Sequence, residues 1–119
     1  MAASLDEFRK ALKALGDALA LPKTDITRDA SIQRFEFCVE LAWKTARKIM
    51  GTSSTAPKTV VREMAQNGMI DLVEPWIQAI DDRNLSSHTY NEKIADQVYD
   101  AAKAFYPLAS ELLKRMEKK

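Results

Sequence analysis

Apolar residues recur every three or four positions over most of the chain, the spacing that places them along one face of an α-helix. The first such run follows Ser4, and Glu7 three residues later completes the pattern of a capping box at a helix start. The run ends at Leu21-Pro22, and its apolar positions are Leu5, Phe8, Leu12, Leu15 and Leu19. This pattern predicts a first helix with one buried face.

A polar link over residues 23–28 leads to a second predicted helix, from about Asp29 to Met50, which Gly51 ends. Its main apolar stripe is Ile32, Phe35, Val39, Ala42/Trp43, Ala46 and Ile49/Met50, and a second apolar set is Phe37, Cys38 and Leu41. Two interpretations of the second set stay open, because periodicity does not separate a core from a subunit interface. Either the helix is central in one bundle, or its second side meets another subunit.

The next two predicted helices are short. Pro57 suits the first turn of a third helix that Gly68 ends, although Ala56 lacks the side-chain oxygen of a usual cap. A fourth helix has Pro75 in its first turn and is closed by Asp81-Asp82-Arg83. Each has enough apolar residues for one buried side, namely Val60, Val61, Met64 and Ala65 in one and Trp76, Ile77 and Ile80 in the other.

The last predicted helix has the longest regular apolar stripe and starts near Asn91, a good N-cap residue. Pro107 lies inside it and is expected to kink it, because proline lacks a backbone donor and crowds the preceding turn. Together the elements predict an all-α fold, an antiparallel up-and-down bundle of four main helices plus one short helix. The length of 119 residues predicts a single domain over 1–119.

Composition narrows the functional classes. Eighteen basic and seventeen acidic residues leave a formal charge of +1, so nucleic-acid binding requires a local positive patch. Cys38 is the only cysteine and is expected to be a buried, inert thiol. With one histidine and scattered carboxylates, neither a metal site nor a cofactor is expected. No signal peptide or apolar run of about 18–20 residues is present, so a cytoplasmic protein without membrane contact is expected.

One segment, residues 81–90, carries more chemistry than a helix connection needs. It holds the only histidine, His88, together with Arg83, Asn84, two serines and Tyr90. Histidine exchanges protons near neutral pH, and arginine presents a permanent charge in a planar fork that suits phosphate oxygens. A structural interpretation competes, because a lone histidine in a connection is more often a cap or surface residue and Arg83 can form exposed ion pairs. Residue types alone therefore make the segment a candidate site.

The spacing of Arg83 and His88 sets a geometric condition. Five positions along a continuous helix turn two side chains about 140° apart, so these two would diverge. They meet if the helix breaks between them, for which Ser86-Ser87 is suited because serine favours helix ends, or if they meet across a two-fold axis. An extended stretch from Ser87 onward would place His88 and Tyr90 on the same side.

The segment resembles the Arg-x4-His-x-Tyr signature of HepT-like toxins in the HEPN superfamily, and Asn84 supplies the polar residue that this signature prefers after the arginine. Three further blocks are similar to nucleotidyltransferase substrate-binding proteins: Asp29–Lys44, Pro57–Glu63 and Trp76–Arg83. The resemblance covers about residues 4–115 and implies a HEPN-like helical fold. Ala56 departs from the pattern, where a serine or threonine cap is more typical, and this affects the third helix only.

The resemblance implies a homodimeric, metal-independent endoribonuclease toxin. HEPN ribonucleases build their site from the arginine and histidine of two subunits, in a cleft at the dimer interface. Carried over to this chain, His88 acts as general base or acid on a ribose 2′-hydroxyl, Arg83 stabilises charge on the phosphate, and Asn84 orients the pair. The partner protein, a minimal nucleotidyltransferase acting as antitoxin, attaches AMP to the signature tyrosine, here Tyr90.

Four basic residues of the second helix are candidates for binding RNA or nucleotide: Arg34, Lys44, Arg47 and Lys48. An equally well supported alternative is that these four residues lie on a solvated helix face and pair with Glu36 and Glu40. Two other functions stay open. The name of the related proteins implies a non-catalytic substrate- or nucleotide-binding subunit of a two-component nucleotidyltransferase, and a structural dimer with a decayed site is the third interpretation.

Overall fold

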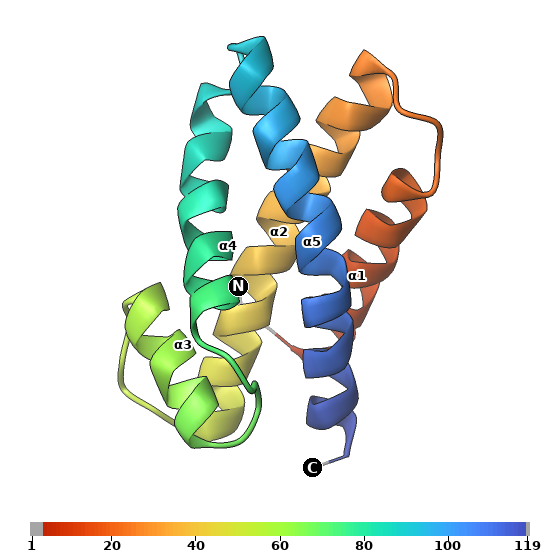
Figure 1. The fold of residues 1–119 in the computed structure, drawn as a ribbon. Helices are drawn as coiled ribbons and strands as arrows, with labels where there is room; N and C mark the ends of the chain where they lie inside the picture. The colour runs from red at the N-terminus through yellow and green to blue at the C-terminus, as the bar shows by residue number, and fades with distance from the viewer. Residues whose placement is uncertain (1–3, 119) are drawn as a thin grey trace.

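The computed structural model describes residues 4–118, and every regular element in that range is a helix. Four long helices run alternately up and down, and a short fifth lies at one end (Figure 1). These are α1 (Leu5–Leu19), α2 (Asp25–Met50), α4 (Glu74–Leu85) and α5 (Glu92–Glu117), with the short α3 (Pro57–Gln66). The predicted all-α bundle is confirmed. None of the helices in the described range combines the length and apolar character needed to cross a membrane.

Most predicted helix ends are confirmed. Ser4 accepts a hydrogen bond from the N–H of Glu7 at 3.1 Å, and Asn91 accepts two from the first turn of α5 at 2.9 and 3.2 Å. Gly51 follows α2 with φ of 68°, a conformation that glycine adopts without a steric penalty. The α5 helix continues through Pro107.

The predicted start of α2 at Asp29 is wrong, because the helix begins at Asp25. Thr24 accepts the N–H of Thr27 at 3.1 Å, and the Thr27 hydroxyl accepts the N–H of Thr24 at 2.7 Å. This reciprocal pair is a capping box in which threonine replaces the usual Glu or Gln. As a result, Arg28 belongs to the first turn of α2 and not to a polar link.

The core is built around α2, which packs against each of the other helices. Phe35 of α2 and Trp76 of α4 both meet the ring of Phe105 of α5 edge-on, with centroid distances of 5.5 and 5.2 Å. Each such buried aromatic side chain stabilises the fold by about 1.5–3 kcal/mol, and the edge-to-face geometry adds to this. The aromatic cluster therefore holds α4 and α5, whose ends carry residues 81–92, against α2.

The second apolar set of α2 divides between the core and the surface. Cys38 is fully buried, and this burial raises the pKa of its thiol to about 12, as expected of an inert cysteine. Leu41 is half-buried against the core. Phe37 is 59% exposed. The bundle itself thus accounts for Cys38 and Leu41, and it leaves Phe37 without a neighbour that covers it.

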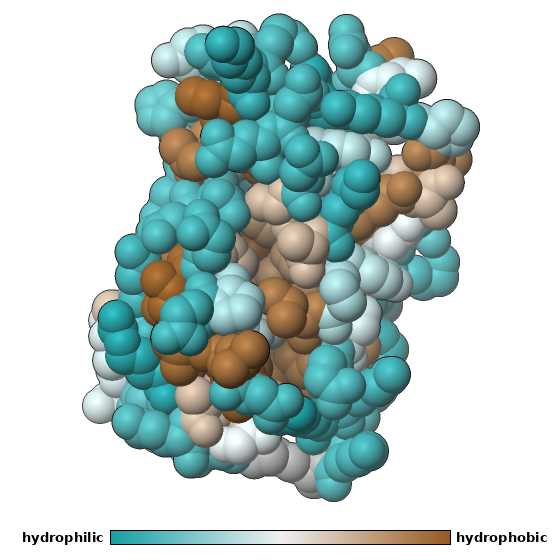
Figure 2. All heavy atoms as spheres, viewed as in Figure 1, coloured by the Kyte–Doolittle hydropathy of each residue, from teal (hydrophilic) through white to brown (hydrophobic). Residues whose placement is uncertain are grey.

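The start of α2, the end of α4 and the start of α5 lie together at one end of the bundle, and α3 lies toward the other end (Figure 1). An apolar groove near that other end runs between the α3–α4 connection and α5. Figure 2, in the same view as Figure 1, shows hydrophobic residues gathered on the lower part of the surface. The groove is lined mainly by Met69, Ile70, Leu72, Trp76, Pro107, Leu108 and Leu112. It lies away from the connection that carries His88.

Candidate functional site

The predicted helix break between Arg83 and His88 is present. The α4 helix ends at Leu85, beyond the predicted end at Arg83, and Ser86–His88 form a short 3-10 turn, η1. The hydroxyl of Ser86 donates to the carbonyl of Arg83. Because serine hydroxyls compete for backbone carbonyls in this way, they favour a helix end at this point.

Two more hydroxyls complete the hydrogen bonding of the connection. Ser87 donates to the carbonyl of Asn84 at 3.1 Å, and Thr89 donates to the carbonyl of Ser86 at 3.2 Å. The N–H of Asn91 then donates to the carbonyl of His88 at 3.1 Å. The connection is held compactly by its own side chains, although most of it is exposed.

The stretch from Ser87 to Tyr90 is not extended, because the chain turns through η1 and Thr89 keeps a helical φ of −76°. His88 and Tyr90 are nonetheless neighbours, with ring centroids 6.0 Å apart and ring planes at 68°. Both side chains are exposed, and Tyr90 is 81% exposed. Packing in the core therefore does not explain Tyr90.

Arg83 turns toward α2. Its Nε lies 3.0 Å from Oε1 of Glu40, which is close enough for an ion pair, but the N–H is not directed at that oxygen and has no hydrogen-bond partner. Within residues 4–118 no hydrogen bond uses the terminal nitrogens of Arg83, and no bond or ion pair joins Arg83 to His88. One chain thus directs the two side chains to different neighbours, Glu40 and Tyr90.

The four basic candidates of α2 fall into two groups. Arg34 donates to the carbonyl of Ala14 at 2.8 Å, and Arg47 donates to the carbonyl of Ser54, so both hold the bundle together. Lys44 pairs with Glu40 at 3.3 Å, which places it on the carboxylate that also pairs with Arg83. Lys48 is exposed. The structure therefore associates only Lys44 of the four with the Arg83 side chain.

Comparison with known proteins identifies the family. The sequence model of the family described as nucleotidyltransferase substrate binding protein like matches residues 3–118. The chain belongs to this family. The matched range includes the whole connection from Arg83 to Tyr90, so the candidate site lies inside the family's common region and not in an addition to it.

Two solved structures share the fold of this chain. One, from Thermus thermophilus, has a TM-score of 0.83 and is 31% identical, with 91% of this chain and 97% of that chain covered. The other, from Haemophilus influenzae, has a TM-score of 0.84 and is 26% identical, with 95% and 98% covered. It is described as revealing the fold of a substrate binding domain of a nucleotidyltransferase.

A curated relative connects the family to HepT. The chain is 29% identical over 97 residues to the probable ribonuclease HepT of Haemophilus influenzae. The match covers 75% of this chain and 66% of the relative, so it spans slightly less than two thirds of that protein's length. The family match and this relative confirm the resemblance to HepT-like proteins.

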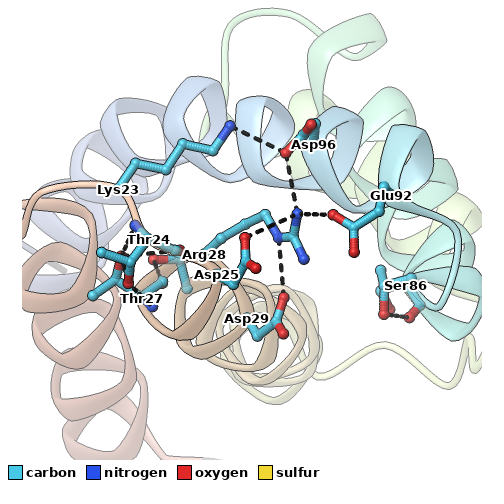
Figure 3. A network of polar contacts seen from close by, with 11 residues as sticks. Lys23, Thr24, Asp25, Thr27, Arg28, Asp29, Ser86, Glu92 and Asp96 are labelled. Carbon is cyan, nitrogen blue, oxygen red and sulfur yellow. Dashed lines mark hydrogen bonds and ion pairs between the residues drawn. The ribbon is translucent and has the colours of Figure 1, made fainter.

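Two residues near the end of the connection were not singled out from the sequence. Arg28 of α2 pairs with Glu92 of α5 at 2.6 Å (Figure 3). A signal for Arg28 exists in the sequence, because the Thr24-x-x-Thr27 box marks a helix start and puts a positive charge in the first turn, against the helix dipole. Glu92 carries no comparable signal, since an acidic residue in the first turn is common.

The buried carboxyl of Asp82, next to Arg83, makes the stability of the fold near the site depend on pH. Asp82 is 7% exposed, and burial raises the pKa of its carboxyl, against the lowering effect of a hydrogen bond from Gln78 at 3.2 Å. The unfolded chain loses this proton at a lower pH than the folded one, so ionisation destabilises the fold as pH rises from about 4 through the raised pKa. Asp82→Asn is therefore expected to increase the free energy of unfolding at neutral pH.

The gain from Asp82→Asn is expected to disappear below about pH 3, where the wild-type carboxyl is neutral in both states. Urea unfolding followed by circular dichroism at the two pH values measures this. Asp100→Asn, at an exposed position of α5, is the matched control and should change stability little at either pH. A lower free energy of unfolding for Asp82→Asn than for wild type at neutral pH would contradict the predicted increase.

Proposed function

We propose that this protein is a HepT-like endoribonuclease whose site combines Arg83 of one subunit with His88 of a second. The helix break at Ser86 carries the proposal. It leaves the terminal nitrogens of Arg83 and the exposed imidazole of His88 without hydrogen-bond partners among residues 4–118. Since the two side chains have different neighbours in one chain, a second chain is the natural source of the missing half of the pair.

The residues suit cleavage of RNA by its own 2′-hydroxyl. His88 accepts the hydroxyl proton, the 2′-oxygen attacks the adjacent phosphorus, and the bond to the 5′-oxygen breaks. The leaving oxygen takes up a proton, and the products are a 2′,3′-cyclic phosphate and a 5′-hydroxyl. Arg83 hydrogen-bonds the phosphate oxygens as their charge grows, and Asn84, which is exposed beside it, orients the phosphate.

The face of α2 that carries Phe37 is the proposed interface of the homodimer. Phe37 is 59% exposed, and helical spacing places it on the same face as Leu41 and Lys44. Glu40, the partner of Arg83, borders this face. A two-fold axis through it would bring both Arg83 connections to one interface, as an isologous dimer requires.

Phe37→Asp is expected to shift the protein from dimer to monomer, because it places a charge in an apolar contact while leaving the monomer's own core intact. Light scattering after size exclusion at tens of micromolar measures the mass. Leu72→Asp is the matched control, since Leu72 is 63% exposed on another part of the surface. A wild-type monomer, or equal effects of the two substitutions, would contradict the assigned interface.

The nuclease activity is tested with purified protein and an RNA oligonucleotide in the presence of EDTA. Cleavage that leaves 2′,3′-cyclic phosphate ends is expected. DNA of the same sequence is the control and should stay intact, because it lacks the attacking hydroxyl. An intact RNA in the presence of a verified dimer would count against the nuclease and in favour of a binding subunit.

We further propose that a partner nucleotidyltransferase blocks this site by modifying Tyr90. The phenol oxygen attacks the α-phosphorus of ATP and loses its proton, the bond to the β-phosphate oxygen breaks, and pyrophosphate leaves. The attached AMP brings a negative charge and bulk beside His88, whose ring lies 6.0 Å from that of Tyr90. The modification would exclude RNA phosphate from the same position.

A second candidate function is a non-catalytic subunit that binds substrate or nucleotide for a separate nucleotidyltransferase. The family description and the Haemophilus influenzae structure, described as a substrate binding domain, favour this alternative. In that case Arg83 and Lys44, which share Glu40, would hold phosphate groups of the ligand. Nucleotide binding without RNA cleavage distinguishes this candidate from the first.

A further inference from the structure

Arg28 is a buried cation in a position that is unfavourable for it. Its side chain is 6% exposed and lies in the first turn of α2. A positive charge at a helix N-terminus opposes the helix dipole, and a charge removed from water loses its hydration. Arg28 therefore depends on nearby carboxylates for its stability in the fold.

Four carboxylates surround Arg28, those of Asp25, Asp29, Glu92 and Asp96, as Figure 3 shows, and Asp25 is the most distant at 4.0 Å. Glu92 lies 2.6 Å and Asp96 3.4 Å from one terminal nitrogen, and Asp29 lies 3.1 Å from Nε. Hydrogen bonds to Glu92 first and Asp29 second raise the pKa of Arg28 above its ordinary value, so it stays charged. Because Glu92 and Asp96 belong to α5, the cluster joins the start of α2 to the start of α5.

This cluster fixes one end of the connection that carries the proposed site. Glu92 begins α5 directly after Asn91, whose N–H donates to the carbonyl of His88. At the other end of the connection, Arg83 pairs with Glu40. Ion pairs to one helix, α2, thus hold both ends of the connection. The hydrogen bonds of the Ser86, Ser87 and Thr89 hydroxyls, by contrast, are local to the connection.

We propose that Arg28 is a positioning residue for the candidate site: through Glu92 it holds the start of α5 against α2 and thereby sets where His88 and Tyr90 stand. This inference rests on the proposed function for its consequence in activity. Arg28 itself is buried, and within residues 4–118 no hydrogen bond or ion pair joins it to His88 or Tyr90, so its effect on RNA is indirect. A misplacement of about 1 Å in a catalytic group lowers a rate by up to about a hundredfold.

Arg28→Met, which removes the charge and keeps an unbranched apolar chain, tests the inference with two readouts. The chain has one histidine, so the imidazole NMR signals belong to His88 without assignment. Those signals are expected to shift in Arg28→Met. The kcat for RNA cleavage is expected to fall about tenfold to a hundredfold, with KM nearly unchanged because the phosphate-binding groups remain.

Arg115→Met is the matched control for a general loss of stability. Arg115 pairs with Asp71 at 2.8 Å and Glu111 at 3.2 Å, beside the apolar groove and away from the connection. The Arg115→Met substitution should leave the His88 signals and kcat unchanged. Arg28→Lys is expected to keep part of the wild-type kcat that Arg28→Met loses. Lysine keeps the charge but cannot bridge several carboxylates in a fixed plane.

Unchanged His88 signals in Arg28→Met, or equal changes in Arg115→Met, would overturn the positioning role. If wild-type protein cuts no RNA, the proposed function fails, and the NMR comparison still decides the positioning role. Glu92→Gln provides the same comparison if Arg28→Met does not fold, because Arg28 then keeps Asp29 and Asp96. Shifted His88 signals in folded Glu92→Gln support the inference, and unshifted signals reject it.

Discussion

His88→Ala is expected to lower the rate constant for RNA cleavage by about a hundredfold or more, because it removes the group that transfers the proton of the 2′-hydroxyl. The free energy of unfolding should change by less than about 1 kcal/mol, since the side chain is exposed and outside the core. Initial rates on a labelled RNA, paired with urea unfolding of the same preparations, measure both quantities.

Arg83→Ala is expected to reduce cleavage to a similar extent, because the developing phosphate charge loses its donors. Arg83→Lys should recover only part of the rate, since lysine lacks the planar fork that binds two oxygens. Arg115→Ala is the matched control, because its side chain is 28% exposed and that of Arg83 is 33% exposed, and both pair with a glutamate. Equal cleavage by wild type, His88→Ala and Arg83→Ala would remove both residues from the mechanism.

Tyr90→Phe is expected to abolish AMP transfer by the partner nucleotidyltransferase. Tyr90 is 81% exposed at the connection, so its hydroxyl is accessible to a second protein. Co-expression with the partner, followed by intact-mass and peptide mass spectrometry, detects the added AMP. Wild-type protein that carries AMP should also lose RNA cleavage, whereas Tyr90→Phe should stay active in the presence of the partner.

The chain provides matched controls for the Tyr90 prediction. Its other two tyrosines are Tyr99, which is 6% exposed, and Tyr106, which is partly buried against α1. Tyr99→Phe and Tyr106→Phe should be modified as wild type is. An unmodified Tyr90 with a partner that is active on another protein would leave Tyr90 as a surface residue and favour the binding subunit.

Local signals predicted most of the fold. The stripes of α1 and α5 and the caps at Ser4 and Asn91 depend on residues within a turn of each other, and these were correct. The start of α2 was missed because its capping box uses Thr27 in place of Glu or Gln. The break at Ser86 was predicted from the same kind of local rule, the preference of serine for helix ends.

The contacts of the site could not be predicted in the same way. Glu40 and Arg83, or Arg28 and Glu92, are far apart in the sequence, and which of many charged residues become partners depends on how the helices pack. Phe37 illustrates a second limit. A helix in contact on two sides has the same periodicity whether the second contact is its own bundle or another subunit, and only the packing shows that Phe37 stays exposed.

A mixing experiment tests the composite site most directly. Arg83→Ala and His88→Ala proteins are each expected to be inactive, and subunit exchange should generate mixed dimers in which one of the two sites has both residues. Random exchange makes half of the dimers mixed, so about a quarter of wild-type cleavage is expected to return. Co-purification through a tag on one variant verifies the exchange. Verified exchange without any return of cleavage, alongside an active wild type, would contradict a site shared between two subunits.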